Sequence, residues 1–597
     1  MCGIAGIIGK VDLNISQMSD RIAHRGPDGS GFWSDESGLA TLAHRRLAIL
    51  DPEAGVQPMH SMNDQYVIVF NGEIYNFPEL RRELELKGRK FQTHCDTEVI
   101  LEGYAVYGLD IVRRLRGMFS FGLWDRCERK LVLARDRMGI KPLFYRIDPQ
   151  GLAFASEAKA LIDVRAELDC KVLVDYLRLG FRTVEGSLFK GVMELPPATT
   201  AVCHVFGGVS MDIQRYWQLP SPIAVGGTIE ENAIHLHDVL TEASRMHLLS
   251  DVPLGFWLSG GLDSSIILRA TKDVIPEDSR TALTLEYGLP NDETPYAKHM
   301  AEESGVRWKL FRGDLNQAGD ILTDLVWHLE EPLPNVTALT TFALARWTKS
   351  QTKVVLIGEG SDELFAGYPT YIPFTGPWKY FPGSIKGWAA ERSYLLPSRS
   401  GWKKLAVPDL AHEMDSITDI PLPHDLDGML RFDLRHELIQ SQLARIDKMT
   451  MAHGVEARVP FLDHQVVETA MQIPVWQKRS NGKTKMVLRK AFERELPEKI
   501  LNRPKYGKRG TQGITGILYN TLVRKLACRL LTKERLAQVG CFRYEGIQRL
   551  LNGRSSIYYL EAKRQKTLYF LVLFDLWHRM FIEGVPRREV AGLIKDS

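Results

Sequence analysis

The chain is too long to fold around a single hydrophobic core. It has 597 residues, whereas single cores stop growing at roughly 250–300 residues. The composition changes at residues 219–227, where two prolines and two glycines form a stretch typical of a linker. We therefore predict two domains, at residues 1–218 and 228–597.

Before the linker, short segments of alternating apolar and polar residues predict strands at residues 66–70, 119–125 and 130–135. The helical patterns between them are few, and they cover residues 79–86 and 97–107. This mixture predicts an α+β fold in which two antiparallel sheets lie between flanking helices.

After the linker, strands and helices alternate. A helical pattern over residues 228–246 precedes apolar strands at 255–258, 282–285 and 353–357. This alternation predicts an α/β parallel sheet, whose ligands bind at the carboxyl ends of the strands. Beyond Asp362 the patterns are mainly helical.

Composition excludes several classes of function. The net charge is only +3, and the most basic short stretch, at 503–509, is typical of a solvated loop, so we expect no nucleic-acid or membrane partner. The N-terminal apolar run is too short for a secretory signal, and no segment reaches the ~18 apolar residues of a membrane helix. The seven cysteines show no CxxC spacing, so we predict neither disulfides nor a zinc site, and expect a cytoplasmic location.

Cys2 is the first candidate nucleophile. Removal of Met1 would leave a thiol and a free α-amine on the same residue. An α-amine with a pKa near ~8 can take the thiol proton, so no histidine base is required. The alternative is a small buried residue that begins an apolar strand, because free cysteine is commonly buried. Position alone leaves both open.

Motifs rich in groups that can hold a zwitterion follow Cys2. They are RGPD at 25–28, AHRRLAI at 43–49, NGEIYN at 71–76 and CDTE at 95–98. With GMFSF at 117–121 and RDRMGIKPL at 135–143, they resemble the N-terminal-nucleophile glutamine amidotransferase domain of glutamine-hydrolysing asparagine synthetases. The resemblance implies a four-layer αββα fold for the first two hundred residues.

The same resemblance implies a glutaminase site. Cys2 would attack the glutamine side-chain amide and form a thioester, while the Asn71 side chain and the Gly72 backbone amide hold the oxyanion. Arg46 would pair with the glutamine carboxylate, and Glu73 and Asp96 would receive its ammonium. The implied glutamine-binding residues are Arg46, Leu47, Ala48, Ile49, Leu50, Asn71, Gly72, Glu73 and Asp96.

A second site is indicated by SGGLDSS at 259–265, which follows a predicted strand and opens a helix. Glycine amides, hydroxyls and a helix N-terminus there converge on a space that suits a phosphate. The string resembles the SGGxDS loop of ATP pyrophosphatases, and it is not a Walker loop, because no Gly-Lys-Ser/Thr follows. Asp263 would repel a polyphosphate unless both hold Mg²⁺, and Asp362, in GEGSDE at 358–363, is the expected second metal ligand.

The resemblance to asparagine synthetases continues at 447–449, 456–463 and 485–489. It implies that Lys485 acts on the adenylate and pyrophosphate charge and that Glu359 takes a proton as ammonia attacks the adenylate. For Glu359, a role as metal ligand or substrate-orienting group is the alternative. The implied ATP-binding residues are Trp257, Leu258, Ser259, Gly260, Gly261, Asp263, Ser264, Tyr287, Ile357 and Gly358.

Together these features imply an enzyme that adenylates aspartate with ATP and amidates it with glutamine-derived ammonia. Departures from the family pattern at Trp257, Ile357, 330–340 and 505–510 leave another carboxylic acid, from a sugar, peptide or natural product, as an alternative acceptor. A catalytically silent scaffold is the alternative from a different class, although the intact acidic cluster argues against it. A homodimer is the oligomer that the resemblance suggests.

Overall fold

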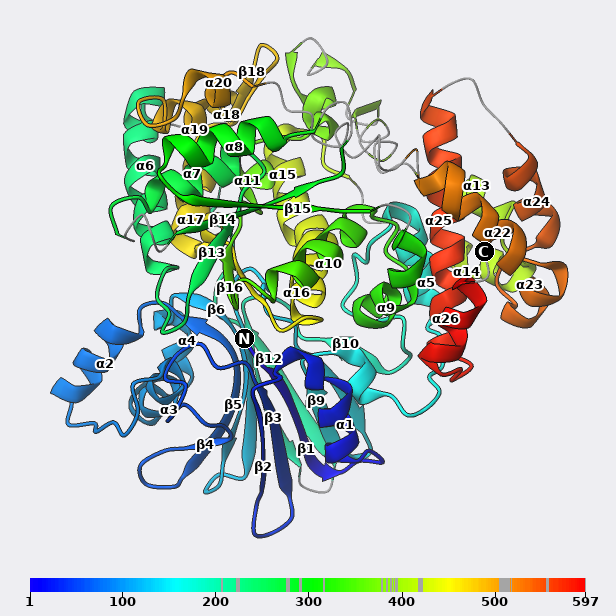
Figure 1. The fold of residues 1–597 in the computed structure, drawn as a ribbon. Coiled ribbons are helices and arrows are strands. Elements are labelled where there is room, and N and C mark those ends of the chain that lie inside the picture. Colours follow the sequence, from blue (N-terminus) through cyan, green and yellow to red (C-terminus); the bar gives the residue numbers. More distant parts are fainter. Residues whose placement is uncertain are drawn as a thin grey trace.

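The computed structural model carries three main sheets, two in the N-terminal third of the chain and one beyond it (Figure 1). It describes residues 1–595 except 206–207, 222–225, 275–279, 289–291, 315–316, 377–379, 383–384, 387–388, 390, 392–395, 417–421, 504–515, 517 and 554–557. The predicted basic stretch at 503–509 and the divergent motif at 505–510 thus lie, apart from Arg503, outside the described residues. No helix within the described ranges is long and apolar enough to cross a membrane.

Two six-stranded antiparallel sheets form the N-terminal third, as predicted. The strand order of the first is β10-β8-β9-β1-β3-β2, and that of the second is β12-β11-β7-β6-β5-β4. The strands are β1 (Gly3–Lys10), β2 (Gly29–Ser34), β3 (Ala40–Arg46), β4 (Met59–His60), β5 (Tyr66–Ile74), β6 (Gly117–Asp125), β7 (Lys130–Arg135), β8 (Phe144–Asp148), β9 (Gln150–Ala155), β10 (Val192–Glu194), β11 (Thr199–Val205) and β12 (Val209–Arg215).

Strand alternation sorts the side chains of each sheet between two cores. On β1, Ile4 and Ile8 face the second sheet and pack with Val67 and Val69, whereas Ala5 faces outward. The Phe154 ring lies where Gly6 has no side chain, because a Cβ there would come within 2.3 Å of it. The sheets can therefore pack closely at this point.

Helices cover both outer faces of this sandwich, which gives the predicted αββα layers. The first sheet is covered by α1 (Ile15–Arg21) and α5 (Cys170–Leu179), and the second by α2 (Phe77–Leu86) and α3 (Asp96–Tyr107), with α4 (Ile111–Arg114) beside them. The helices predicted at 79–86 and 97–107 are thus confirmed.

A five-stranded parallel sheet follows, with the order β15-β14-β13-β16-β17. Its strands are β13 (Leu254–Trp257), β14 (Thr281–Glu286), β15 (Arg307–Arg312), β16 (Val354–Leu356) and β17 (Glu456–Arg458). The helices around it are α6 (Ile229–Met246), α7 (Leu262–Ala270), α8 (Thr294–Glu303), α9 (Ala318–Leu329), α10 (Thr337–Thr348), α16 (Ala444–Met451), α17 (His464–Gln472) and α19 (Met486–Ala491).

The chain beyond Asp362 is mainly helical, as predicted, but β17 is an exception. It pairs in parallel with β16 through Glu456, Ala457 and Arg458. Three residues with charged ends carry no strand signal, so the sequence patterns could not show it. A short hairpin of β18 (Arg479–Ser480) and β19 (Lys483–Thr484) is the second exception.

Many of the remaining helices share one hydrophobic core with α5 and α9. The remaining helices include α11 (Ser361–Leu364), α13 (Arg399–Lys403), α14 (Pro408–Ser416), α15 (Leu426–Arg435), the π-helices Leu438–Leu443 and Tyr519–Val523, α18 (Val475–Lys478), α20 (Glu498–Leu501), α22 (Arg524–Leu530), α23 (Lys533–Val539), α24 (Tyr544–Asn552), α25 (Tyr558–Phe581) and α26 (Arg587–Lys595). Figure 1 shows α25 and α26 beside α9, and the N-terminus at the junction of the sandwich and the parallel sheet.

Candidate active sites

Cys2 lies at that junction, immediately before β1. Its backbone N–H donates to Asn71 Oδ1 at 2.9 Å, and its carbonyl accepts from Arg25 Nε at 3.1 Å. Burial raises the pKa of the thiol, against the opposing effects of the nearby N-terminal ammonium and of a hydrogen bond from the Leu47 backbone. The thiol therefore needs an adjacent base to become a nucleophile.

Met1 precedes Cys2, and its ammonium donates to Glu456 Oε2 at 2.7 Å. Both groups are fully buried. Burial disfavours the charged amine, but Glu456 and other negative groups outweigh this and raise its pKa. A positively charged α-amine is thus held at a site supplied by β17, from the far half of the chain.

Two carboxylates predicted to receive an ammonium, Glu73 and Asp96, lie in the same buried group as Glu456. Burial and the neighbouring Glu456 raise the pKa of Glu73 well above its ordinary value, and burial raises that of Asp96 to about 6. Arg458 pairs with Glu73 at 3.4 Å and with Glu456 at 2.5 Å. Glu456 supplies the negative charge that holds the Met1 ammonium, because this ammonium and Arg458 outweigh burial and lower the pKa of Glu456 to about 2, whereas Glu73 is pushed toward its neutral form.

The segment 46–50 lies beside Cys2, but its side chains have local partners. The Arg46 guanidinium donates to the carbonyls of Asp51 and Pro52, both at 2.6 Å. Leu47 and Ile49 pack with Met1, and the Ala48 amide donates to Asp28 at 2.9 Å. The half-buried Leu50 ends the segment.

Asn71 and Gly72 lie on β5, opposite Ser120 and Phe119 of β6. The Asn71 side chain is fully buried and reaches Cys2 through its Oδ1 atom. A Cβ on Gly72 would lie 2.1 Å from the Met118 carbonyl oxygen, so this position requires glycine. The structure thus brings the Asn71 side chain to the backbone of Cys2, and Gly72 follows Asn71 on β5.

The second candidate site begins at the carboxyl end of β13, in the turn that leads into α7. Gly260 has a φ of +68°, and a Cβ there would meet the Ala297 amide at 2.3 Å. The Ser259 hydroxyl accepts from the Gly261 amide and contacts the Ser264 hydroxyl, both at 3.2 Å. Glycine conformation and hydroxyl contacts together fold this loop.

Lys485 joins the two predicted metal ligands. Its Nζ donates to both Asp263 oxygens at 2.7 Å, pairs with Asp362 Oδ1 at 2.7 Å and reaches Ser361 at 3.1 Å. Burial disfavours its charge, but the two aspartates outweigh this and raise its pKa. Three residues that lie far apart in the sequence, with 222 positions between Asp263 and Lys485, therefore meet beside the serine-glycine loop.

A cavity of about 280 Å³ opens at this cluster. Its lining includes the predicted residues Trp257, Ser259, Asp263, Ser264, Ile357, Gly358, Glu359 and Asp362. Glu359 pairs with Arg445 at 3.0 Å, and Arg445 also donates to Thr341 at 2.6 Å. Cationic, anionic and hydroxyl groups thus face one space.

Some predicted nucleotide contacts lie away from this cavity. Leu258 donates to the Leu283 carbonyl at 2.9 Å and accepts from the Thr284 hydroxyl at 2.7 Å. Tyr287 lines a separate, much smaller cavity against Gly313. Gly260 and Gly261 shape the loop without lining the cavity, and the Gly260 carbonyl accepts from Arg503 at 2.8 Å.

Sequence reasoning missed the parts of both sites that come from distant segments. It noted the motif containing Glu456 and Arg458 but gave neither residue a role, and it left Arg445 and Ser361 unassigned. No local pattern could place β17 beside Cys2, because a partner hundreds of residues away leaves no periodic trace.

Two family models match the chain. Residues 1–217 match the family described as glutamine amidotransferase domain, and residues 235–579 match asparagine synthase. Asparagine synthetase [glutamine-hydrolyzing] 1 of Bacillus subtilis is 33% identical, covering 85% of this chain and 86% of its own. The Zea mays protein named asparagine synthetase [glutamine-hydrolyzing] is 31% identical over 85% and 77% of the two chains. Amidase chry2 of Gibberella zeae is 27% identical over 89% and 90%.

Proposed function

The chain belongs to the glutamine-hydrolysing asparagine synthetase family, and on that premise we propose that it makes asparagine from aspartate, glutamine and ATP. The observation that carries the proposal is the meeting of Lys485, Asp263 and Asp362 beside the 259–265 loop. A lone glutaminase has no use for such an arrangement, whereas an enzyme that activates a carboxylate with ATP does.

In the glutaminase half, removal of Met1 frees the Cys2 α-amine to take the thiol proton. The thiolate attacks the glutamine side-chain carbonyl, the Asn71 side chain and Gly72 amide stabilise the oxyanion, and ammonia leaves a thioester. Water then hydrolyses the thioester to release glutamate. The high thiol pKa supports this role for the amine, because burial alone disfavours the thiolate.

The position of the Met1 ammonium supports a binding site for the glutamine α-ammonium. It lies in a cluster with Glu456, Glu73 and Asp96, and removal of Met1 would vacate that position for the glutamine α-ammonium. Arg46 would release the Asp51 and Pro52 carbonyls to pair with the substrate carboxylate, beside the 47–50 backbone.

The synthetase half fits a Mg²⁺-bound nucleotide. The carboxylates of Asp263 and Asp362 both contact the Lys485 ammonium beside the loop that suits a phosphate. Mg²⁺ commonly binds through one or two carboxylates plus substrate phosphates. When bound there, Mg²⁺ would neutralise phosphate charge. Ser259, Gly260, Gly261 and Ser264 would position the phosphates.

The remaining groups would bind adenosine and act on the aspartate carboxylate as it is activated and amidated. Adenosine would lie against Trp257, Leu258, Tyr287, Ile357 and Gly358. Lys485 would stabilise charge as the aspartate carboxylate displaces pyrophosphate to form the aspartyl adenylate. Glu359, held by Arg445, would take a proton from the attacking ammonia as AMP leaves.

The direct test follows pyrophosphate and amidated product, identified by mass, from MgATP, glutamine and aspartate. Cys2→Ala should abolish glutamine-dependent synthesis while ammonia-dependent synthesis persists, because the adenylating half is intact. Cys127→Ala, at an exposed cysteine, is the matched control. Glutaminase activity that survives in Cys2→Ala would contradict the nucleophile assignment. Pyrophosphate release that requires another carboxylic acid and does not occur with aspartate would contradict the proposed acceptor.

Three further parts of this proposal concern organisation. The functional units are residues 1–218 and 228–597, the enzyme works in the cytoplasm, and two copies form a homodimer. The seven free thiols fit a reducing compartment. Sedimentation of the purified chain tests the dimer, and fractionation of cells tests the location.

A further inference from the structure

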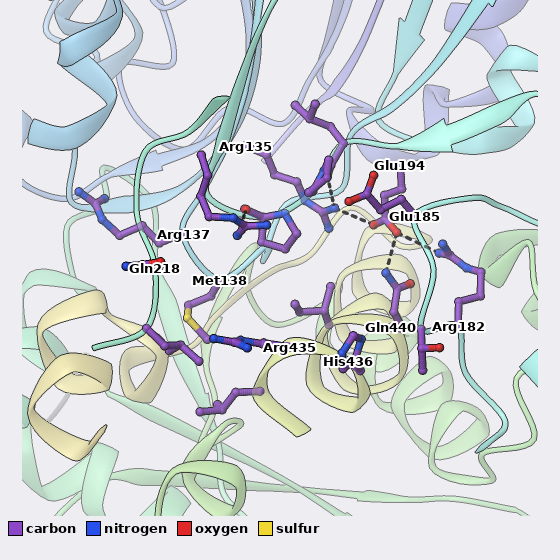
Figure 2. Close-up of a pocket in the computed structure, with 18 of the residues that line it drawn as sticks. Arg135, Arg137, Met138, Arg182, Glu185, Glu194, Gln218, Arg435, His436 and Gln440 are labelled. Atoms are coloured by element: carbon purple, nitrogen blue, oxygen red, sulfur yellow. Dashed lines mark hydrogen bonds and ion pairs between the residues drawn. The ribbon is translucent and has the colours of Figure 1, made fainter. Parts of the chain in front are cut away.

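A larger cavity, separate from both candidate active sites, lies between the two halves of the chain (Figure 2). Its volume is about 390 Å³, which is within the range of small-molecule sites. The ends of β7 and β12 form one wall, and the end of α15 with the π-helix Leu438–Leu443 forms another. π-Helical turns are rare and occur frequently at functional sites.

One side of this cavity carries a buried carboxylate, Glu194, whose charge is paired. Glu194 pairs with Arg135 at 2.8 Å and Arg182 at 3.0 Å, and it accepts from Gln440 at 2.8 Å. Burial would raise the pKa of Glu194, but the two arginines bring it to about 2. Figure 2 shows these side chains linked to one another, so the charge of Glu194 is fully paired, and the exposed Glu185 is the other carboxylate that lines this side.

The other side carries Arg137, Arg215 and Arg435, and no carboxylate pairs with any of them among the described residues. Arg137 is only 8% exposed, donates only to the carbonyls of Leu115 and Arg113, and has a buried Nε without a partner. Arg215 donates to the Pro197 carbonyl at 3.1 Å. This side is therefore cationic.

The arginines also repel one another. Arg435 is exposed at one end, but its partial burial lowers its pKa, and the nearby charges of Arg431 and Arg215 lower it further. Arg431 has its own partner in Asp427 at 2.6 Å, and His436 is neutral at pH 7 because burial and Arg435 bring its pKa to about 4. An anion between the two halves would relieve this repulsion, since like charges in proximity are destabilising.

We propose that this cavity binds a small organic anion whose phosphate or carboxylate groups lie between Arg215 and Arg435. Guanidinium groups present paired donors that match both kinds of oxyanion. The body of the ligand would lie against Trp217 and Leu219, which also line the cavity. The Trp217 ring is fixed by its N–H, which donates to Glu468 at 2.6 Å.

Calorimetric titration of the full chain, without ATP or glutamine, tests the proposal. The probes are citrate, glucose 6-phosphate and inorganic phosphate, and preference between the first two separates carboxylate from phosphate recognition. At least one organic probe should bind at one site and raise the midpoint of thermal unfolding. The double variant Arg215→Ala/Arg435→Ala should weaken binding by about tenfold or more.

Both replaced side chains are exposed, so the fold should persist. Arg82→Ala, at an exposed arginine of α2, is the control and should bind like the unmodified chain. Should the double variant not fold, Arg435→Gln must weaken binding in its place. Equal affinity in these variants, binding of inorganic phosphate alone, or no binding of any probe at roughly 10 mM would overturn the proposal.

Discussion

Lys485 has an unusual backbone as well as a central position. Its φ is +53° and its ψ is 39°, in the left-handed region that non-glycine residues rarely adopt, and it immediately precedes α19. Such conformations persist where the surrounding structure holds them, often at functional sites. Here the contacts of Nζ with Asp263 and Asp362 supply that constraint.

Lys485→Met should therefore reduce aspartate-dependent pyrophosphate release by ~100-fold or more, because the charge that develops on the phosphates loses its cation. Glutaminase activity should stay unchanged. Lys490→Met, on the same helix with a half-exposed side chain, should leave both activities intact. A pyrophosphate rate within twofold of the unmodified enzyme would remove Lys485 from the mechanism.

Lys478 is a different kind of lysine, because it is fully buried and its Nζ has no hydrogen-bond partner among the described residues. Burial lowers its pKa to about 7. The unfolded chain therefore holds this proton between pH 7 and the ordinary lysine pKa of roughly 10.4, while the folded chain has released it. In this pH window the ionisation of Lys478 therefore makes the free energy of unfolding increase as pH rises.

Lys478→Met should raise the free energy of unfolding at pH 7 by about 2–4 kcal/mol, and with it the midpoint of thermal unfolding. The gain should shrink as pH approaches 10, because the unfolded lysine also becomes neutral there. Scanning calorimetry at several pH values measures it, and Lys483→Met, at an exposed position, is the control. A gain that grows with pH would contradict the buried neutral amine.

At the scale of elements, α6 shows how a local signal begins a helix. The Thr228 hydroxyl accepts from the Glu231 amide at 3.2 Å, and the Glu231 carboxylate accepts from the Thr228 amide at 2.9 Å. This capping box satisfies amides at the start of the helix. The helix then packs against α17 and α19.

Thr228→Ala should lower the stability of the C-terminal half by about 1 kcal/mol, since it removes the cap without touching the core. Thr228→Ser keeps the hydroxyl and should restore most of the loss. Chemical denaturation followed by circular dichroism measures both variants. Equal losses in the two would show that the threonine methyl group, rather than the cap, matters.

At the scale of the whole molecule, buried ion pairs join the two halves. Arg116, before β6, donates to Asp463 at 2.8 Å, and Asp463 caps α17. Burial would raise the pKa of Asp463, but Arg116 lowers it. A depressed carboxylate pKa contributes stability that is present above roughly pH 4 and lost as pH falls through the folded value.

Arg116→Met should cost about 3 kcal/mol at pH 7, because it leaves a buried carboxylate unpaired. The difference from the unmodified chain should narrow below pH 4, as Asp463 becomes protonated. Arg114→Met removes an exposed pair with Glu83 and should cost less than about 1 kcal/mol. Equal midpoints of thermal unfolding for the two variants would mean that the interface does not depend on this contact.

The sequence by itself determined the features that depend on local pattern. Alternation in 66–70 and 130–135 predicted strands that the structure contains, and SGGLDSS predicted the turn between β13 and α7. Such features were predictable because period, turn residues and capping act within a few positions of one another.

Only the tertiary structure decided which distant groups meet. It placed Glu456 and Arg458 beside Glu73 in the candidate glutaminase site, although the sequence motif suggested a role only in the other half. It also brought Arg215 toward Arg435 across the junction. Long-range packing and charge pairing make these contacts, and neither leaves a periodic signal in the sequence, so folding the whole chain was needed to show them.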